Sequence, residues 1–148
     1  MADAQFNVVS NLSIGDFIAE GGDTVENHAG GGKLKVYGRF QPWTDFFFGC
    51  ELQTGAVLDL SRQSGVWNST SRVKTSSVKP PRTVTFASGA TITIDVGART
   101  DAGDHGKIVS WTAAPANVTF RLADGIRGRL VVTSEGIFLR RGLMLIVR

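Results

Sequence analysis

The chain has a single cysteine, Cys50, among its 148 residues. No intramolecular disulfide can form, so the fold must be stabilised by its hydrophobic core. Cys50 lies between an aromatic run and an expected strand, which favours a buried, unreactive thiol over a nucleophile. Zinc prefers three or four Cys and His ligands, and here only His28, Cys50 and His105 are available, far apart in sequence. We therefore expect no zinc centre, and no other cofactor.

Long apolar runs are also missing. No stretch approaches the roughly 20 apolar residues that a membrane-spanning helix needs. Residues 1–20 lack the basic and continuous apolar segments of a signal peptide. The nucleophile elbow G-x-S-x-G and the phosphate-binding loop G-x-x-x-x-G-K-[ST] are absent as well. We expect a soluble chain that does not insert into a membrane and is not an enzyme.

Positive charge is missing from the first part of the chain. Residues 1–32 hold five acids and no Lys or Arg, whereas residues 33–148 hold the other eight acids and all sixteen basic residues. Such asymmetry indicates either a polyanionic partner or an acidic end that packs on the basic body, and we favour the second.

What the sequence has in quantity is glycine, at eighteen residues, together with alternating β-branched and aromatic positions. No segment sustains helical periodicity over three turns, and only residues 14–21 suggest a helical turn. The sequence therefore predicts an all-β protein. Strands are expected at 5–10, 33–40, 45–52, 56–61, 82–86, 90–97, 107–111, 117–122, 128–133 and 136–148.

Two regions are expected from this pattern. Residues 1–32 form an acidic N-terminal strand followed by a glycine-rich linker, and residues 33–148 form a β-rich domain with an internal loop at 61–81. Three similar strand–turn–strand segments are marked by Gly55, Gly89 and Gly125, at spacings of 34 and 36 residues. A repeat of this length indicates stacked units, as in a solenoid. Chance matches between β segments leave a β-sandwich or jelly roll as the alternative.

The segments VTFASGATITIDVGAR, KIVSWTAAPANVTFRL and SEGIFLRRGLMLIVR carry a resemblance to a known family. Through them, residues 33–148 resemble the C-terminal part of bacterial autotransporter-associated β-strand-repeat surface proteins. The resemblance implies a short right-handed parallel β-helix that acts as a scaffold or adhesive surface. It also favours an extracellular surface or a virion as the location.

Aromatic and basic residues supply candidate contact sites. Trp43 and Phe47 belong to the aromatic run 39–49, which could stack on sugar rings or dock a partner, although core packing or self-association is favoured. Trp67 is a third ligand-contact candidate, but one tryptophan is not a nucleic-acid platform. The expected loop also holds basic residues without an acid, interpreted as a solvated face rather than a polyanion site: Arg62, Arg72, Lys74 and Lys79.

Acidic residues gather after the strand at 90–97. Asp95, Asp101 and Asp104 are weak candidates for a Ca²⁺ site, but turn formation by Asp and Gly explains them better. Asp59 and Asp95 resemble a catalytic carboxylate pair only in that both lie in expected strands. The apolar C-terminal run needs cover on both faces, which makes Met144 and Ile146 interface candidates.

These observations favour a non-enzymatic structural or adhesive module of bacterial-surface or phage-fibre type. It is expected to self-associate or join a larger assembly, with a glycan as a candidate ligand and no nucleic acid. The alternative is a carbohydrate-active enzyme, of lyase or hydrolase type, on a β-helix.

Overall fold

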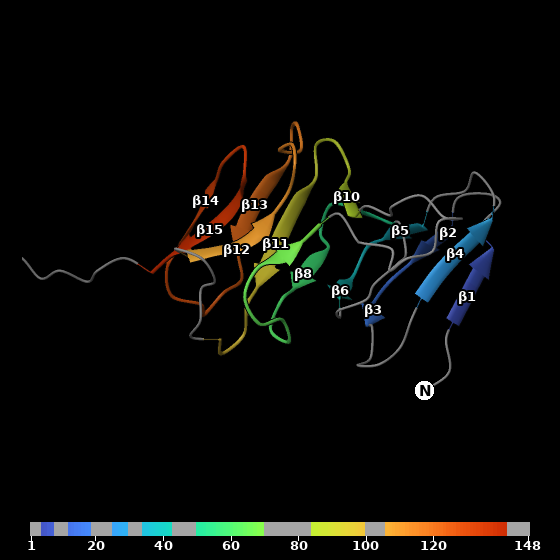
Figure 1. Ribbon diagram of the computed structural model, residues 1–148, viewed down its shortest axis with the longest axis horizontal. Coiled ribbons are helices and arrows are strands. Elements are labelled where there is room, and N and C mark those ends of the chain that lie inside the picture. Colours follow the sequence, from blue (N-terminus) through green and yellow to red (C-terminus); the bar gives the residue numbers. More distant parts are fainter. Residues whose placement is uncertain are drawn as a thin grey trace, which may run out of the picture.

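The computed structural model describes residues 4–7, 12–18, 25–29, 34–42, 50–69, 84–99 and 106–141. Every element in these ranges is a β-strand, and most neighbouring strands are parallel (Figure 1). The expected all-β class is therefore confirmed. In the same ranges, no helix has the length and apolar character needed to cross a membrane.

The first sheet contains four parallel strands whose spatial order follows the chain. Its register places Leu12, Leu34, Cys50 and Val84 in one row across the sheet. Val36 and Leu52 occupy the next inward row and are fully buried. The strands are β2 (Leu12–Ile14), β5 (Leu34–Val36), β7 (Cys50–Leu52) and β10 (Val84–Phe86).

The second sheet has five strands, again parallel and again in chain order. One apolar row crosses the whole sheet through Phe17, Phe40, Leu58, Ile94 and Leu122. Because side chains alternate along a strand, the residues beside this row face outward. The strands are β3 (Phe17–Ile18), β6 (Arg39–Gln41), β8 (Val57–Asp59), β11 (Thr91–Asp95) and β13 (Thr119–Leu122).

The third sheet changes direction part-way across. Its strands are β9 (Trp67–Asn68), β12 (Lys107–Ser110), β15 (Gly136–Arg140) and β14 (Arg129–Val132), in that spatial order. β9 and β12 are parallel, whereas β15 runs antiparallel to both β12 and β14. A separate parallel pair, β1 (Ala4–Asn7) with β4 (Val25–Ala29), lies at the opposite end of the molecule (Figure 1).

Backbone hydrogen bonds continue through the corner between the first and second sheets. Tyr37 N donates to Ile14 O, Gln53 N to Val36 O, and Ala87 N to Leu52 O, each at 2.9 Å. Each time the chain comes back to the first sheet, this new return of the chain is hydrogen-bonded to the previous one at the corner as well as in the strands. The returns differ in length: Leu12 to Leu34 takes 22 residues, Leu34 to Cys50 takes 16 and Cys50 to Val84 takes 34.

All three glycines of the expected repeat lie in turns between strands, but only Gly55 and Gly89 occupy equivalent positions before strands of the second sheet. Gly55 (φ 89°) and Gly89 (φ 82°) occupy the turns before β8 and β11. Gly125 instead follows β13, and the turn before β13 contains Asn117 at φ 58°. Asparagine tolerates the left-handed region better than other side chains. The repeat was therefore misassigned in its third unit because a different residue type fills the turn.

The described structure does not divide at residue 32. β2 pairs with β5 and β3 with β6, and the rings of Phe17 and Phe40 lie 5.8 Å apart. β2 and β3 of the acidic segment are therefore part of the first and second sheets, whereas β1 and β4 form a pair of their own. Residues 25–29 of the expected linker form β4, residues 17–18 of the expected helical turn form β3, and residues 67–68 of the expected loop form β9.

The strand expected at 33–40 is two strands, because the chain turns at Gly38. A Cβ atom at this position would lie 2.8 Å from the carbonyl carbon of Gly15, so a side chain would push the two corners apart. The missing side chain at Gly38 lets the two backbones approach closely, whereas a Cβ at Gly15 would meet nothing within 4 Å. The alternation of residue types continues through the corner, so the sequence gives no sign that the strand ends there.

Three aromatic rings cover the core where the first sheet has no described strand beyond β10. Phe86 lies 5.1 Å from Phe120 and 6.5 Å from Trp111, and Trp111 lies 5.7 Å from Phe120, between ring centroids. The Trp111 indole N–H donates to Thr133 O at 3.1 Å. This bond ties the aromatic cluster to the turn that joins β14 and β15.

Gly136 gives a direct test of how closely β15 approaches β12. It has φ 155°, and a Cβ there would collide with the carbonyl oxygen of Val109. We expect G136A to lower the free energy of unfolding by several kcal/mol, of order 3 or more, because backbone must move. G125A is the control: its φ is 85° but nothing lies within 4 Å of the added Cβ, so a cost of about 1–2 kcal/mol is expected. Equal losses in urea denaturation would contradict this packing.

Candidate functional site

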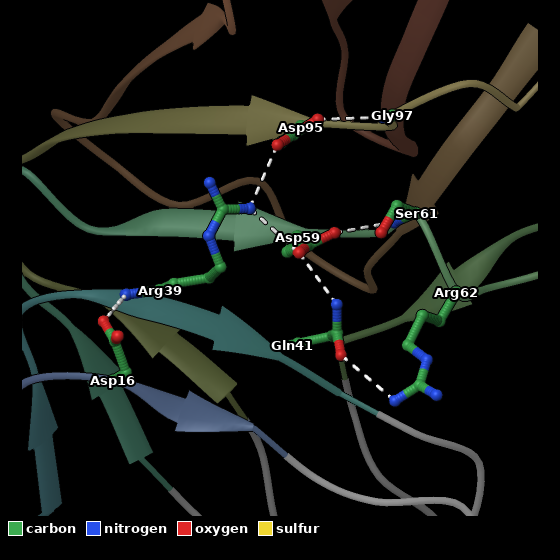
Figure 2. A network of polar contacts seen from close by, with 8 residues as sticks. All are labelled: Asp16, Arg39, Gln41, Asp59, Ser61, Arg62, Asp95 and Gly97. Carbon is green, nitrogen blue, oxygen red and sulfur yellow. Dashed lines mark hydrogen bonds and ion pairs between the residues drawn. The ribbon is translucent and has the colours of Figure 1, made fainter.

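The outer face of the second sheet carries a connected polar cluster near the ends of β6, β8 and β11 (Figure 2). We call it the Arg39 cluster; its members are Asp16, Arg39, Gln41, Asp59, Ser61, Arg62, Asp95 and Gly97. Asp59 and Asp95 are direct register partners on β8 and β11. Their inward neighbours Leu58 and Ile94 are fully buried, and this burial fixes which way the two strands face.

One guanidinium nitrogen bridges the two carboxylates. Arg39 Nη1 donates to Asp59 Oδ2 at 2.9 Å and to Asp95 Oδ2 at 3.0 Å. The backbone N–H of Arg39 also donates to Asp16 Oδ1 at 2.7 Å. Arg39 thereby connects the corner before β3 to β6, β8 and β11, which are four successive returns of the chain.

The second oxygen of each aspartate closes a turn. Asp59 Oδ1 accepts from Ser61 N at 2.9 Å, and Asp95 Oδ1 accepts from Gly97 N at 2.8 Å. These are the same two-residue Asx turn on consecutive strands. The placement of Asp95 agrees with turn formation as its role, while Asp101 and Asp104 lie outside the described residues.

Gln41 extends the cluster toward solvent. Its Nε2 donates to Asp59 Oδ2 at 2.8 Å, and its Oε1 accepts from Arg62 Nη1 at 3.4 Å. Asp59 therefore accepts hydrogen bonds from Arg39, Gln41 and Ser61.

These contacts set the protonation of the cluster. Burial alone would raise the pKa of Asp59, but hydrogen bonds from Ser61, Arg39 and Gln41 outweigh it and hold the pKa below its ordinary value. Hydrogen bonds to Asp95 and then to Asp59 raise the pKa of Arg39. Both groups are therefore charged at neutral pH.

This geometry suits structural support better than acid–base catalysis. A glycosidase needs one carboxyl group with a raised pKa to donate a proton, and the two carboxyl groups must face each other across the substrate. Asp59 and Asp95 instead lie side by side on adjacent strands, are bridged by Arg39, and are bonded to turn amides.

Trp67 is the one aromatic ligand-contact candidate that the structure describes, and its position argues against that role. Its side chain is 6% exposed and meets the Phe40 ring edge-on at 6.4 Å. A buried indole has no face to offer a sugar. Sequence reading placed it in a polar loop because its serine- and threonine-rich surroundings conceal the short strand β9.

Of the basic-loop candidates, Arg62 is exposed and contacts Gln41. The remaining candidates lie outside the described residues: Trp43, Phe47, Arg72, Lys74, Lys79, Met144 and Ile146.

Cys50 is 3% exposed, and burial raises the pKa of its thiol. It is therefore protonated and unreactive at neutral pH. Within the described ranges, no three His, Cys, Asp or Glu side chains come together as a metal-binding group.

Sequence reading missed Arg39 and Gln41. A usable signal was present in the segments D-L-S at 59–61 and D-V-G at 95–97, which place the same turn after two similar strands. Such a match indicates stacked aspartates, and stacked aspartates require a cation. Choosing Arg39 among the sixteen basic residues required the register.

The depressed pKa of Asp59 has a consequence for stability. Because the folded-state pKa lies below the unfolded value, Asp59 stabilises the fold above about pH 4 and loses this contribution as pH falls through the folded pKa. We expect the difference in free energy of unfolding between wild type and D59N to shrink as pH is lowered from about 6 to 2. D124N is the control, because Asp124 pairs with Arg121 on the open surface with 98% of its side chain exposed. A pH-independent D59N difference would refute the assignment.

The bridging role of Arg39 is tested by R39M, which keeps much of the aliphatic chain. Two carboxylates would then face each other without a cation, and Asp59 is only 5% exposed. We expect a loss of about 1–3 kcal/mol in urea denaturation. R62M removes an exposed arginine at the edge of the cluster, where its hydrogen bond to Gln41 is long at 3.4 Å, and it should cost less than about 0.5 kcal/mol. In R39M, D95N should recover part of the loss, since it removes one of the opposed charges.

The chain was compared with protein-family models, curated protein sequences and solved structures, and no match was found in any of the three.

Proposed function

We propose that the chain is a non-catalytic structural or adhesive module, built as a short right-handed parallel β-solenoid, of bacterial-surface or phage-fibre type. The observation that carries the proposal is the Arg39 cluster, in which Arg39 joins paired carboxylates on two successive strands and so connects successive returns of the chain. A module of this kind acts through its shape and its outer surface.

The solenoid is supported by the order of the strands. From β5 to β6, and from β7 through β8 to β9, the chain passes from sheet to sheet in a fixed sequence before returning to the first sheet. Each return adds its strand beside the previous one, in parallel and in register. Parallel crossovers are right-handed in nearly all proteins. A β-sandwich or jelly roll is built mainly from antiparallel strands, so parallel pairing favours the solenoid.

A structural role is supported by how the polar groups are used. Both oxygens of Asp59 and of Asp95 accept hydrogen bonds from the protein itself. A catalytic carboxylate must instead reach substrate or water. The cluster contributes to the fold because Arg39 bridges two carboxylates that the parallel register places side by side.

An adhesive role is supported by the outer faces of the sheets. The exposed threonines Thr91 and Thr119 are register partners on the neighbouring strands β11 and β13, and Thr85 is exposed on β10 of the first sheet. Parallel sheets place such side chains in regular rows, and hydroxyl rows suit contact with the hydroxyls of a glycan. The resemblance to β-strand-repeat surface proteins supports the same location and use.

The in-register Asp59–Asp95 pair favours one second candidate, a carbohydrate-active enzyme. The two functions are separated by incubating the protein with neutral and acidic polysaccharides. Reducing ends and the ultraviolet absorbance of unsaturated products would be followed, and a glycan array probed in parallel. We expect no turnover above background, with any glycan signal unaffected by D95N. Turnover that D95N abolishes in a folded protein would establish the enzyme and overturn the structural proposal.

A further inference from the structure

The hairpin at the C-terminal end of the described structure has one strand edge without a neighbour. β14 pairs with β15 on one side, and no described strand of the third sheet lies on its other side. β14 and β15 lie toward one end of the longest axis, with β1 and β4 at the other (Figure 1). We call the unpaired side of β14, over Arg129–Val132, the β14 edge. An edge of this kind can accept a strand from another molecule.

The register of the hairpin shows which backbone groups face the β14 edge. Thr133 N donates to Gly136 O at 2.8 Å, so these two residues form a hydrogen-bonded pair. Hydrogen-bonded and non-hydrogen-bonded pairs alternate along an antiparallel ladder, which places Leu130 and Val132 in non-hydrogen-bonded positions. Their backbone N–H and C=O groups therefore point away from β15. These are the groups that a strand added at the β14 edge would meet.

The β14 edge is apolar on the side that faces the core. Leu130 is the register partner of Leu139, which is 3% exposed, and it packs partly buried against the core. Val132 is the register partner of Ile137, which is fully buried. Opposite side chains share one face of an antiparallel pair, yet Val132 itself is 46% exposed. The core-facing side of the hairpin is therefore not fully covered at this edge.

Charges of opposite sign stand at the two ends of the β14 edge. Arg127 lies shortly before β14, and Glu135 lies in the turn that follows it. Both residues are exposed. In the part of the chain that the structure describes, neither of these side chains forms an ion pair. The edge therefore carries a cation at one end and an anion at the other, each without a described counter-charge.

We propose that the β14 edge pairs with the β14 edge of a second copy of this chain, so that two molecules form a twofold-symmetric dimer. A twofold contact uses the same surface on both copies, and it makes the two β14 strands antiparallel. The third sheet then continues from one copy into the other. This deepens the proposed function, on which it rests, by naming the partner of the structural module and the surface that binds it.

One register pairs every outward group of the edge. With the twofold axis at Val131, Leu130 of each copy lies opposite the partner's Val132, and their outward N–H and C=O groups form hydrogen-bonded pairs. The leucines and valines of the two copies then cover one another on the core-facing side. An axis at Leu130 or at Val132 would set that residue opposite itself and leave the other one beyond the partner strand.

The same register is electrostatically self-complementary. Arg127 and Glu135 are each four positions from Val131, so each Arg127 is brought to the partner's Glu135. Symmetry provides this pair twice. Like charges do not meet, because Arg129 stands opposite the partner's Thr133. Exposed pairs of this kind contribute mainly to orientation and register rather than to affinity.

A second copy fits this edge better than an unrelated strand does. An unrelated strand would need a cation, an apolar pair and an acid at matching positions, whereas a reversed copy of the edge supplies all of them. One strand and a few side chains make a small contact, and small interfaces are weak. We therefore expect a dimer dissociation constant of roughly 10–100 µM.

Two kinds of variant test the edge. V132K puts a charge into the apolar part of the contact, beside the partner's Leu130, and it should leave the monomer folded because Val132 is half exposed. Y37K is the matched control, since Tyr37 is 47% exposed but lies between β5 and β6. R127E and E135R each set like charges against one another across the axis. Circular dichroism melting checks that every variant is folded.

Sedimentation velocity at about 1–300 µM protein follows the assembly. Wild type and Y37K should pass from monomer to dimer and go no further, because a twofold contact is closed. V132K should associate at least roughly tenfold more weakly, and R127E and E135R roughly tenfold more weakly each. An equimolar mixture of R127E and E135R should recover the dimer, since opposite charges then face each other in both pairs.

Other outcomes overturn the proposal. Monomeric wild type at the highest concentration contradicts it, and so does a series of oligomers beyond the dimer. A wild-type dimer that V132K and R127E leave unchanged would place the interface on another surface. If V132K does not fold, the exchange of charge between R127E and E135R decides the question alone. The measurement contains no polysaccharide, so the dimer and the non-catalytic function can fail separately.

Discussion

Parallel pairing in register places equivalent residues of successive strands directly beside one another, roughly 4.8 Å apart. Every row across the first and second sheets therefore consists of near-equivalent positions. The side chains of each row must be able to pack directly beside one another. For the apolar rows this is favourable: Phe17, Phe40, Leu58 and Ile94 form one continuous column. The buried core follows from this constraint.

The same constraint creates the main electrostatic problem of the fold. Asp59 and Asp95 each serve their own Asx turn, so neither is easily replaced locally, yet the register sets them side by side. Arg39, from the preceding return of the chain, removes the repulsion through a single nitrogen atom bonded to both carboxylates. The cluster is thus a consequence of stacking turns that use aspartate, and that origin is the physical basis for a structural role.

The two ends of the molecule handle their exposed strands differently. At the C-terminal end β15 reverses direction against β12, and the aromatic rings of Phe86, Trp111 and Phe120 lie over the core. At the N-terminal end the described strands keep one edge without a described neighbour. The described structure therefore has one end that finishes in an antiparallel hairpin and one end with open parallel edges.

Residue types alone determined the all-β class, the burial of Cys50 and most of the long strands, because alternation and turn residues act within a few positions. They also indicated the turns at Gly55 and Gly89. The short strands β2, β3, β4 and β9 were not predicted from the sequence, because the alternating pattern over two to five residues is too short to indicate a strand among polar neighbours. Only the tertiary structure decided which residues share a row, because chain returns of 16, 22 and 34 residues give no fixed repeat to count. The bridge from Arg39 to Asp59 and Asp95, the burial of Trp67 and the unpaired edge of β14 all depend on that register, and register is set by packing across the whole sheet.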